Sequence, residues 1–118
     1  MKNFSSFEKI FICGYPVDFR KGILSLSALV SAELQEDFFS EALFLFYNKS
    51  RNCIKAVYWD YSGFAMWVKL LDKEKFPFPK NNHEKKYTIT EEQLKWILSG
   101  IDPWKIKTHK KLQYKKII

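Results

Sequence analysis

The stretch that most restricts the fold is ALFLFYNKSRNCIKAVYWDYSGFAMWVKLLD, residues 42–72, where three apolar runs are separated by two short polar breaks. The runs are rich in β-branched and aromatic residues, which is typical of strands. The break at Asn48–Asn52 has the length of a hairpin loop. Asp60 and Gly63 occupy the first and fourth positions of an expected type I turn. The stretch therefore predicts a three-stranded meander.

Large apolar side chains occur on both faces of these expected strands. In the last run, side chains alternate in direction: Phe64, Met66 and Val68 point one way, and Ala65, Trp67 and Lys69 point the other. We expect one face to pack on a helix. The other face needs a second cover, from this chain or from a partner.

The remaining segments complete an α+β pattern. EKIFICGY (residues 8–15) predicts a first strand, and the apolar spacing over residues 19–36 predicts an amphipathic helix. FPFPK (residues 76–80) is too rich in proline for regular structure. In the second helix, Thr90 is the expected N-cap of a capping box with Gln93, and Gly100 is the expected terminator.

The predicted fold is an α+β domain over residues 1–104, followed by a basic C-terminal tail at 105–118. We expect strand, helix, three-stranded meander and helix in that order. The sheet would be antiparallel, with about four strands, and both helices would pack on one face. A chain of 118 residues is long enough for one such domain.

The segment GYPVDFRKG (residues 14–22) carries an unusual charge pattern. If Asp18 caps the first helix, Arg20 and Lys21 fall in the first turn, where the helix dipole disfavours cations. Gly22 is a weak helix former that would let another backbone segment approach closely. Two interpretations stay open: an anion site at the helix start, or an internal ion pair of Arg20 with Asp18 or Asp60.

Positive charge is concentrated at the C-terminal end. The chain has 20 Lys and Arg against 13 acids, and residues 105–118 contain six lysines and no acid. Such a tail can bind polyanions through counterion release, or it can simply be a solvated segment. The hairpin loop adds Lys49 and Arg51, followed by Lys55 along the strand. The candidate DNA or phosphate contacts are Arg20, Lys21, Lys49, Arg51, Lys55, Lys69, Lys105, Lys107, Lys110, Lys111, Lys115 and Lys116.

Catalytic and metal-binding patterns are weak. The sequence has no G-x-S-x-G motif and no P-loop, and neither histidine has a partner nearby in sequence. Cys13 and Cys53 lie in apolar runs and are expected to be buried thiols; their spacing to the histidines fits no zinc motif. We therefore expect a protein that is not an enzyme and has no catalytic residue, metal or cofactor. Trp59 and Trp67 could stack on bases but are expected in the core.

The sequence also has no segment long enough to span a bilayer, and its first residues make a poor signal peptide. We expect a cytoplasmic protein without a membrane partner or an evident small-molecule substrate.

Four segments together resemble the small TnpB accessory proteins encoded by the second reading frame of IS66-type insertion sequences. These are GYPVDFRKGILSLSALV, LFLFYNKSRNCIKAVYWDYSGFAMWVKLLD, KFPFP and LKWILSGID, in the same order and spacing. The resemblance covers residues 10–102 and excludes the tail. This chain departs from the family in three places: Lys69-Leu70-Leu71 replaces Lys-Arg-Leu, Phe78 replaces a tryptophan, and the hairpin loop has fewer arginines.

The resemblance implies a non-catalytic accessory factor for DNA transposition that assists a separate transposase of the same element. The expected partners are that transposase and the transposon DNA. The alternative is a protein–protein adaptor that docks the transposase on the aromatic second face of the sheet, without direct DNA contact.

Overall fold

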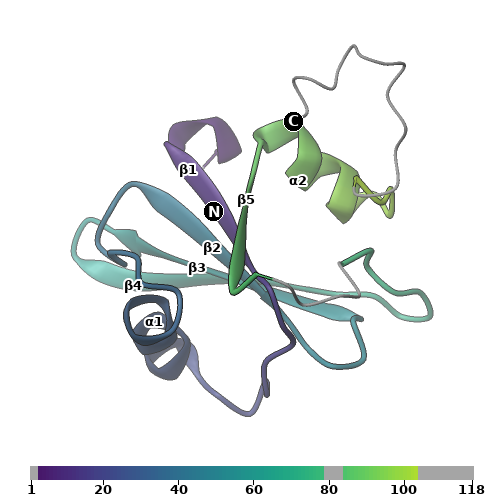
Figure 1. Cartoon of the computed structure of the whole chain (residues 1–118), viewed down its shortest axis with the longest axis horizontal. Helices are drawn as coiled ribbons and strands as arrows, with labels where there is room; N and C mark the ends of the chain where they lie inside the picture. The colour runs from purple at the N-terminus through teal and green to yellow at the C-terminus, as the bar shows by residue number, and fades with distance from the viewer. Residues whose placement is uncertain (1–2, 79–83, 104–118) are drawn as a thin grey trace.

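The computed structural model describes residues 3–78 and 84–103 (Figure 1). In chain order the elements are a 3-10 helix (Phe4–Ser6), β1 (Lys9–Cys13), α1 (Ile23–Ala32), β2 (Ala42–Tyr47), β3 (Cys53–Asp60), β4 (Gly63–Leu70), β5 (Lys86–Ile89) and α2 (Glu91–Leu98). The strands form one sheet in the order β4-β3-β2-β1-β5. The α+β class and the β2-β3-β4 meander are confirmed; the predicted tail lies outside the described residues.

In the described part of the chain the sheet is mixed and has five strands, so the prediction of about four antiparallel strands was wrong. β1 pairs in parallel with β2, Lys9 lying opposite Ala42. Parallel neighbours need a crossover connection, and the segment containing α1 supplies it. The additional strand, β5, pairs antiparallel with β1. It has only four residues and directly precedes the capping box of α2. So short a run gives too little alternation for a strand to be predicted from the sequence.

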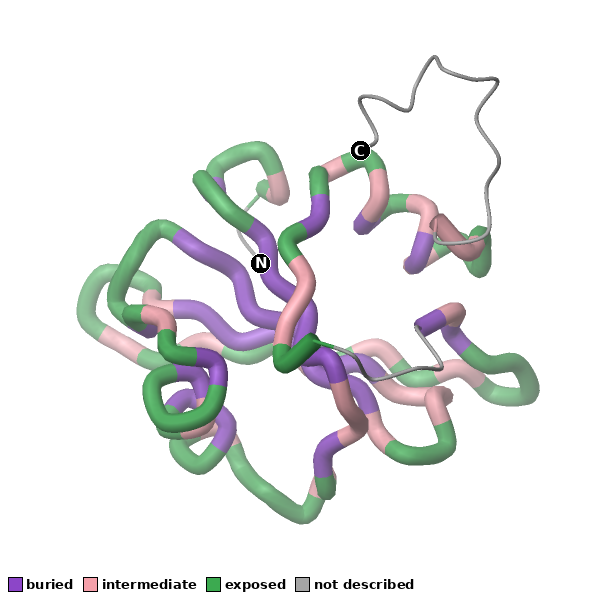
Figure 2. The backbone as a smooth tube through the Cα atoms, in the orientation of Figure 1, coloured by how far each residue is buried: buried purple, intermediate pink, exposed green. Residues whose placement is uncertain are grey.

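The two helices cover opposite faces of the sheet (Figure 1), and the prediction of both on one face was wrong. Every residue of β2 is buried (Figure 2), because alternate side chains enter two separate cores. Phe44 and Phe46 pack with α1, whereas Leu43 and Leu45 pack with α2 and the 76–78 segment. The second cover that the sheet required thus comes from this chain.

Helix α1 begins at Ile23, later than the predicted start at residue 19. Gly22 is the N-cap, with extended backbone (φ −86°, ψ −173°) and no side-chain cap. Arg20 and Lys21 therefore precede the first turn, and the expected dipole conflict does not arise. Asp18, the cap considered from the sequence, does not cap the helix. A Cβ at Gly22 would meet nothing within 4 Å. The expectation that another backbone segment approaches this glycine closely was therefore wrong.

Helix α2 follows its sequence signals. The Thr90 hydroxyl accepts a hydrogen bond from the Gln93 N–H (3.0 Å), and the Gln93 side chain accepts one from the Thr90 N–H (2.8 Å). Gly100 has φ +86°, and the Ile101 N–H donates to the Trp96 carbonyl, as in a Schellman C-terminus. The predicted capping box and terminator are confirmed.

The turn between β3 and β4 differs from the type I turn expected. Its loop is Tyr61-Ser62, closed by the pair Asp60 and Gly63, and Tyr61 has φ +57°. A positive φ at the first central residue is typical of type I′ and type II′ turns, whose twist suits a two-residue hairpin. Glycine is preferred at that position because it lacks a Cβ.

Replacing Tyr61 with glycine is therefore expected to stabilise the protein by about 0.5–1 kcal/mol. Relief of the left-handed backbone conformation is worth roughly 1–2 kcal/mol, and glycine's greater freedom in the unfolded chain offsets part of it. Tyr61 is 92% exposed, so little packing is lost. Urea unfolding followed by circular dichroism measures the change. The matched change Ser62→Gly, at a residue with ordinary φ, should destabilise; equal effects at both positions would contradict the turn geometry.

None of the helices within residues 3–78 and 84–103 is long and apolar enough to cross a membrane.

Candidate nucleic-acid interface

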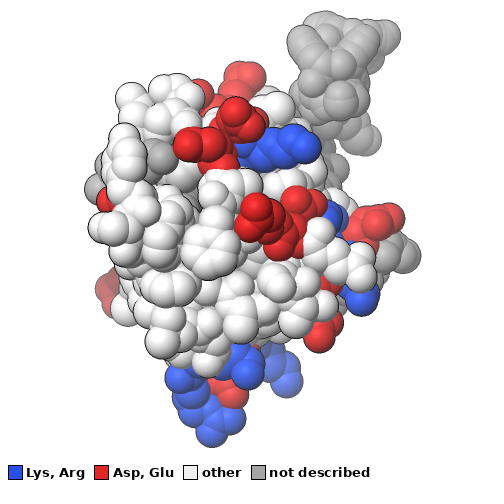
Figure 3. Space-filling view, turned by 90° about the vertical axis from the view of Figure 1, so that its left-hand side faces the viewer, with Lys and Arg blue, Asp and Glu red and all other residues white. Residues whose placement is uncertain are grey.

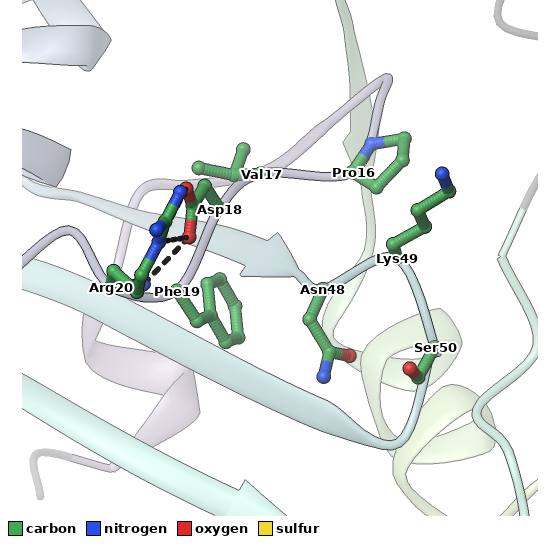
Figure 4. Close-up of a pocket in the computed structure, with 8 residues that line it drawn as sticks. All are labelled: Pro16, Val17, Asp18, Phe19, Arg20, Asn48, Lys49 and Ser50. Atoms are coloured by element: carbon green, nitrogen blue, oxygen red, sulfur yellow. Dashed lines mark hydrogen bonds and ion pairs between the residues drawn. The ribbon is translucent and has the colours of Figure 1, made fainter.

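An open pocket of about 540 Å³ lies between the loop that follows β1 and the hairpin loop that joins β2 to β3 (Figure 4). Its lining residues are Pro16, Val17, Asp18, Phe19, Arg20, Asn48, Lys49 and Ser50. The two loops are neighbours because β1 and β2 run in parallel and end at the same edge of the sheet. The Val17 N–H donates to the Tyr47 carbonyl (2.9 Å), which fixes the first loop beside the second.

The hairpin loop is held by Asn48. Its side-chain oxygen accepts hydrogen bonds from the backbone N–H groups of Asn52 and Cys53, each 3.1 Å long. Its side-chain nitrogen donates to the Asn52 side chain (2.7 Å). Arg51 adopts φ +62°. These bonds give the loop a defined shape and leave Lys49 and Ser50 at its tip.

Arg20 forms an ion pair with Asp18 at 2.6 Å. The Asp18 carboxylate accepts hydrogen bonds from Nε and Nη2 of the guanidinium and from the Arg20 backbone N–H. These bonds lower the pKa of Asp18 to about 2, and the paired carboxylate raises the pKa of Arg20. Of the two acids considered from sequence, Asp18 is thus the partner.

This ion pair does not withdraw Arg20 from solvent. The Arg20 side chain is 91% exposed, and it lines the pocket. Solvent-exposed ion pairs contribute little to stability. Within residues 3–78 and 84–103, Nη1 of Arg20 makes no hydrogen bond. The guanidinium therefore keeps donors that can reach an anion.

Lys21 and Lys49 are exposed, and their ammonium groups make no hydrogen bond or ion pair in the described part of the chain. Figure 4 places Arg20 and Lys49 at opposite ends of the pocket, with the Lys49 side chain directed away from the strands. Figure 3 shows a group of Lys and Arg side chains at the lower edge of one face, with a small acidic patch among them and larger acidic patches higher on the same face.

The other three candidates in the described region make structural contacts. Lys55 Nζ donates to the Phe19 carbonyl (3.2 Å) and lies 4.8 Å from the centre of the Phe19 ring. Lys69 Nζ donates to the Leu98 carbonyl (3.3 Å) at the end of α2.

Arg51 Nη1 donates to the Phe78 carbonyl (2.8 Å), and the guanidinium lies over the Tyr47 ring. Lys55 and Arg51 thus fasten the two loops of the pocket to the rest of the fold. The six tail lysines lie outside the described residues.

The tryptophans and cysteines occupy structural positions. Trp59 makes edge contacts with Phe39 (4.8 Å) and Phe64 (5.2 Å), and Trp67 packs against the core on the α2 face. Cys13 is buried, and burial raises the pKa of its thiol to about 11.

Cys53 is half-buried, and burial also raises its pKa. In the described ranges, no cluster of three or more His, Cys, Asp or Glu side chains could hold a metal ion. The two histidines lie outside those ranges.

Sequence reasoning missed the pocket itself. Asn48, Ser50 and Pro16 were not candidate site residues, and the two loops are far apart along the chain. Only the role of Asn48 could have been predicted, because the side chain of an asparagine at the start of a short loop often hydrogen-bonds to the backbone of that loop.

The chain matches the profile of the family described as "IS66 Orf2 like protein" over residues 8–108. Two uncharacterised proteins of Sinorhizobium fredii are similar to it. The protein y4jC is 31% identical over 84% of this chain and 84% of its own length. The protein y4hO is 30% identical over 80% of this chain and 81% of its own. No solved structure matches. The chain therefore belongs to the IS66 Orf2-like (TnpB) family of insertion-sequence accessory proteins.

Proposed function

We propose that this protein assists a separate transposase, without catalysing the reaction itself, by binding the phosphate backbone of transposon DNA. The binding surface is the basic pocket between residues 16–21 and 48–50, supplemented by the tail lysines. The observation that carries the proposal is the placement of the exposed Arg20 and Lys49 side chains on one open pocket; the exposed Lys21 follows Arg20 in the chain.

The chemistry of the pocket suits a phosphate. Arginine donors form charge-assisted hydrogen bonds with phosphate oxygens, and lysine acts as a flexible point charge. Each neutralised phosphate releases condensed counterions, so binding of this kind weakens as salt rises. The loops that present these cations are braced by backbone hydrogen bonds, which lowers the ordering cost of binding.

Fluorescence anisotropy of the full chain with transposon-end DNA and scrambled DNA, over a range of salt concentrations, tests the proposal. Arg20→Ala and Lys49→Ala are each expected to weaken binding and to reduce the slope of log affinity against log salt by about 1. Lys95→Ala is the matched control, because it removes an exposed lysine on α2. An equal loss in all three variants would contradict a role for the pocket.

A variant with the six tail lysines replaced by glutamine separates the pocket from the tail. If this variant loses all binding while Arg20→Ala loses none, the tail alone holds DNA and the pocket proposal fails. Preference for transposon ends that disappears in Arg20→Ala would support recognition at the pocket.

Asp18→Asn is expected to strengthen DNA binding, because it removes a negative charge beside the phosphate site while keeping an acceptor for the Arg20 N–H. Acidification should not imitate this variant. The pKa of Asp18 is lowered to about 2, so the carboxylate remains charged at pH 5. Weaker binding by Asp18→Asn would mean that the carboxylate orients Arg20 rather than competing with the phosphate.

In the adaptor alternative, the transposase would dock on the aromatic second face of the sheet. The second face of the sheet is covered by α2 and the 76–78 segment. A transposase that co-purifies with this protein, together with absence of DNA binding, would favour the adaptor.

A further inference from the structure

Strand β4 forms one edge of the sheet and carries an exposed apolar row along its length. Phe64, Met66, Val68 and Leu70 are 43%, 38%, 47% and 68% exposed. They lie on the same side of the sheet as α1, whereas Ala65 and Trp67 pack into the opposite core. A contiguous apolar row on an edge strand is typical of an interaction surface.

Within residues 3–78 and 84–103, the backbone of β4 also has hydrogen-bonding groups along this edge that pair with no other strand. In a two-residue hairpin, the closing pair exchanges hydrogen bonds, and bonded pairs then alternate along the strands. Asp60 and Gly63 are the closing pair. The N–H and C=O groups of Gly63, Ala65, Trp67 and Lys69 therefore face β3, and those of the four residues in the exposed row face the open edge.

Strand β4 lacks three of the features that usually protect an edge strand, namely proline, bulges and short length. It pairs with β3 over eight consecutive residues without a bulge. Its one charge, Lys69, is directed to the Leu98 carbonyl at the end of α2. The opposite edge strand, β5, has only four residues, and its Lys86 ammonium pairs with Glu36 at 2.5 Å.

We propose that β4 pairs antiparallel with β4 of a second copy of this chain, about a two-fold axis at Trp67. The residues whose backbone groups face the open edge then pair with each other. Phe64 lies opposite Leu70 of the second copy, and Met66 lies opposite Val68. The two sheets become one continuous sheet, and the two apolar rows meet on one face of it.

A second copy fits this edge because the row is self-complementary. Its four side chains are all apolar, so a two-fold contact brings apolar groups against apolar groups, as an isologous interface requires. In the proposed register Lys69 lies opposite Ala65 of the second copy, and no like charges oppose each other. Leu24, at the start of α1, is 63% exposed and lines a groove with Phe64 that adjoins the row.

Sedimentation equilibrium of the full chain without DNA tests this proposal independently of the proposed function. The wild-type chain is expected to have the mass of a dimer. Met66→Lys and Val68→Glu are each expected to have the mass of a monomer, because each buries a charge in the shared face. Thr88→Lys, which adds a lysine to the other edge, should remain a dimer. Thermal unfolding followed by circular dichroism establishes that each variant is folded.

Mixing the two charged variants tests the register. The ammonium group introduced by Met66→Lys in one chain would face the carboxylate introduced by Val68→Glu in the other, so the mixture is expected to recover dimer mass. A wild-type chain that remains monomeric, or a dimer unaffected by either variant, would overturn the proposal. So would a monomer that gains mass only with the transposase, which would assign the edge to that protein instead.

Discussion

Replacing Gly14 with alanine is expected to destabilise the fold by about 3 kcal/mol, because the added methyl group has no space. Gly14 follows β1, and its N–H donates to the Lys85 carbonyl (2.8 Å). A Cβ on Gly14 would lie 1.8 Å from the Glu84 carbonyl oxygen. That oxygen belongs to the backbone leading into β5, so it can move only if the pairing of β5 with β1 is disturbed. Urea unfolding followed by tryptophan fluorescence measures the loss.

Gly22→Ala is the matched control for this prediction. It lies in the same segment, but a Cβ there would meet nothing within 4 Å, and its backbone is extended. Alanine is a poorer N-cap than glycine, so a loss below about 1 kcal/mol is expected. If Gly14→Ala were as stable as Gly22→Ala, the close approach of residues 84–85 to the end of β1 would be refuted.

Features set by neighbouring residues could be predicted from the sequence. The capping box of α2 depends on Thr90 and Gln93, three positions apart. The alternation along β4 depends only on the two-residue period of a strand. The meander follows from three apolar runs joined by short loops. In each case the interacting groups are close along the chain, so the pattern itself carries the information.

Features that join distant segments could not be predicted in this way. The parallel pairing of β1 with β2 follows from a crossover, whereas sequence shows only two apolar runs. The strand β5 gains its stability from pairing with β1, not from its own four residues. The start of α1 was predicted too early because Phe19 fits the helical spacing. Phe19 in fact lies in the loop before the helix, where its carbonyl accepts a hydrogen bond from Lys55 of β3.

The same distinction between local and long-range features applies to the candidate site. That Arg20 and Lys49 are cations was evident, but their placement at the two ends of one pocket follows from the β1–β2 pairing. Equally, no local pattern separates these residues from Arg51 and Lys55. Both of those side chains reach across the fold to backbone carbonyls, at Phe78 and Phe19. Charge could be read from sequence, whereas availability to a ligand could not.

The largest loss of stability is expected from Phe44→Ala, at about 3–5 kcal/mol. Phe44 is fully buried in β2, and its ring stacks with Phe11 (5.5 Å) and Phe38 (6.1 Å). These rings connect β1, β2 and the segment that follows α1. Truncation would remove the transfer free energy of the ring and leave a cavity that the sheet cannot close. Phe39→Ala is the control: Phe39 is 60% exposed, so a loss of about 1 kcal/mol is expected.

The unfolding curve of Phe44→Ala also tests whether the two cores unfold together. Phe44 belongs to the core on the α1 face, and its neighbour Leu45 to the core on the α2 face. Because β2 contributes alternate residues to both cores, neither core can lose this strand while the other keeps it. Phe44→Ala and Leu45→Ala should therefore each unfold in one transition, with fluorescence and circular dichroism coinciding. Separate transitions in either variant would show that the two faces of the sheet unfold independently, against the architecture described.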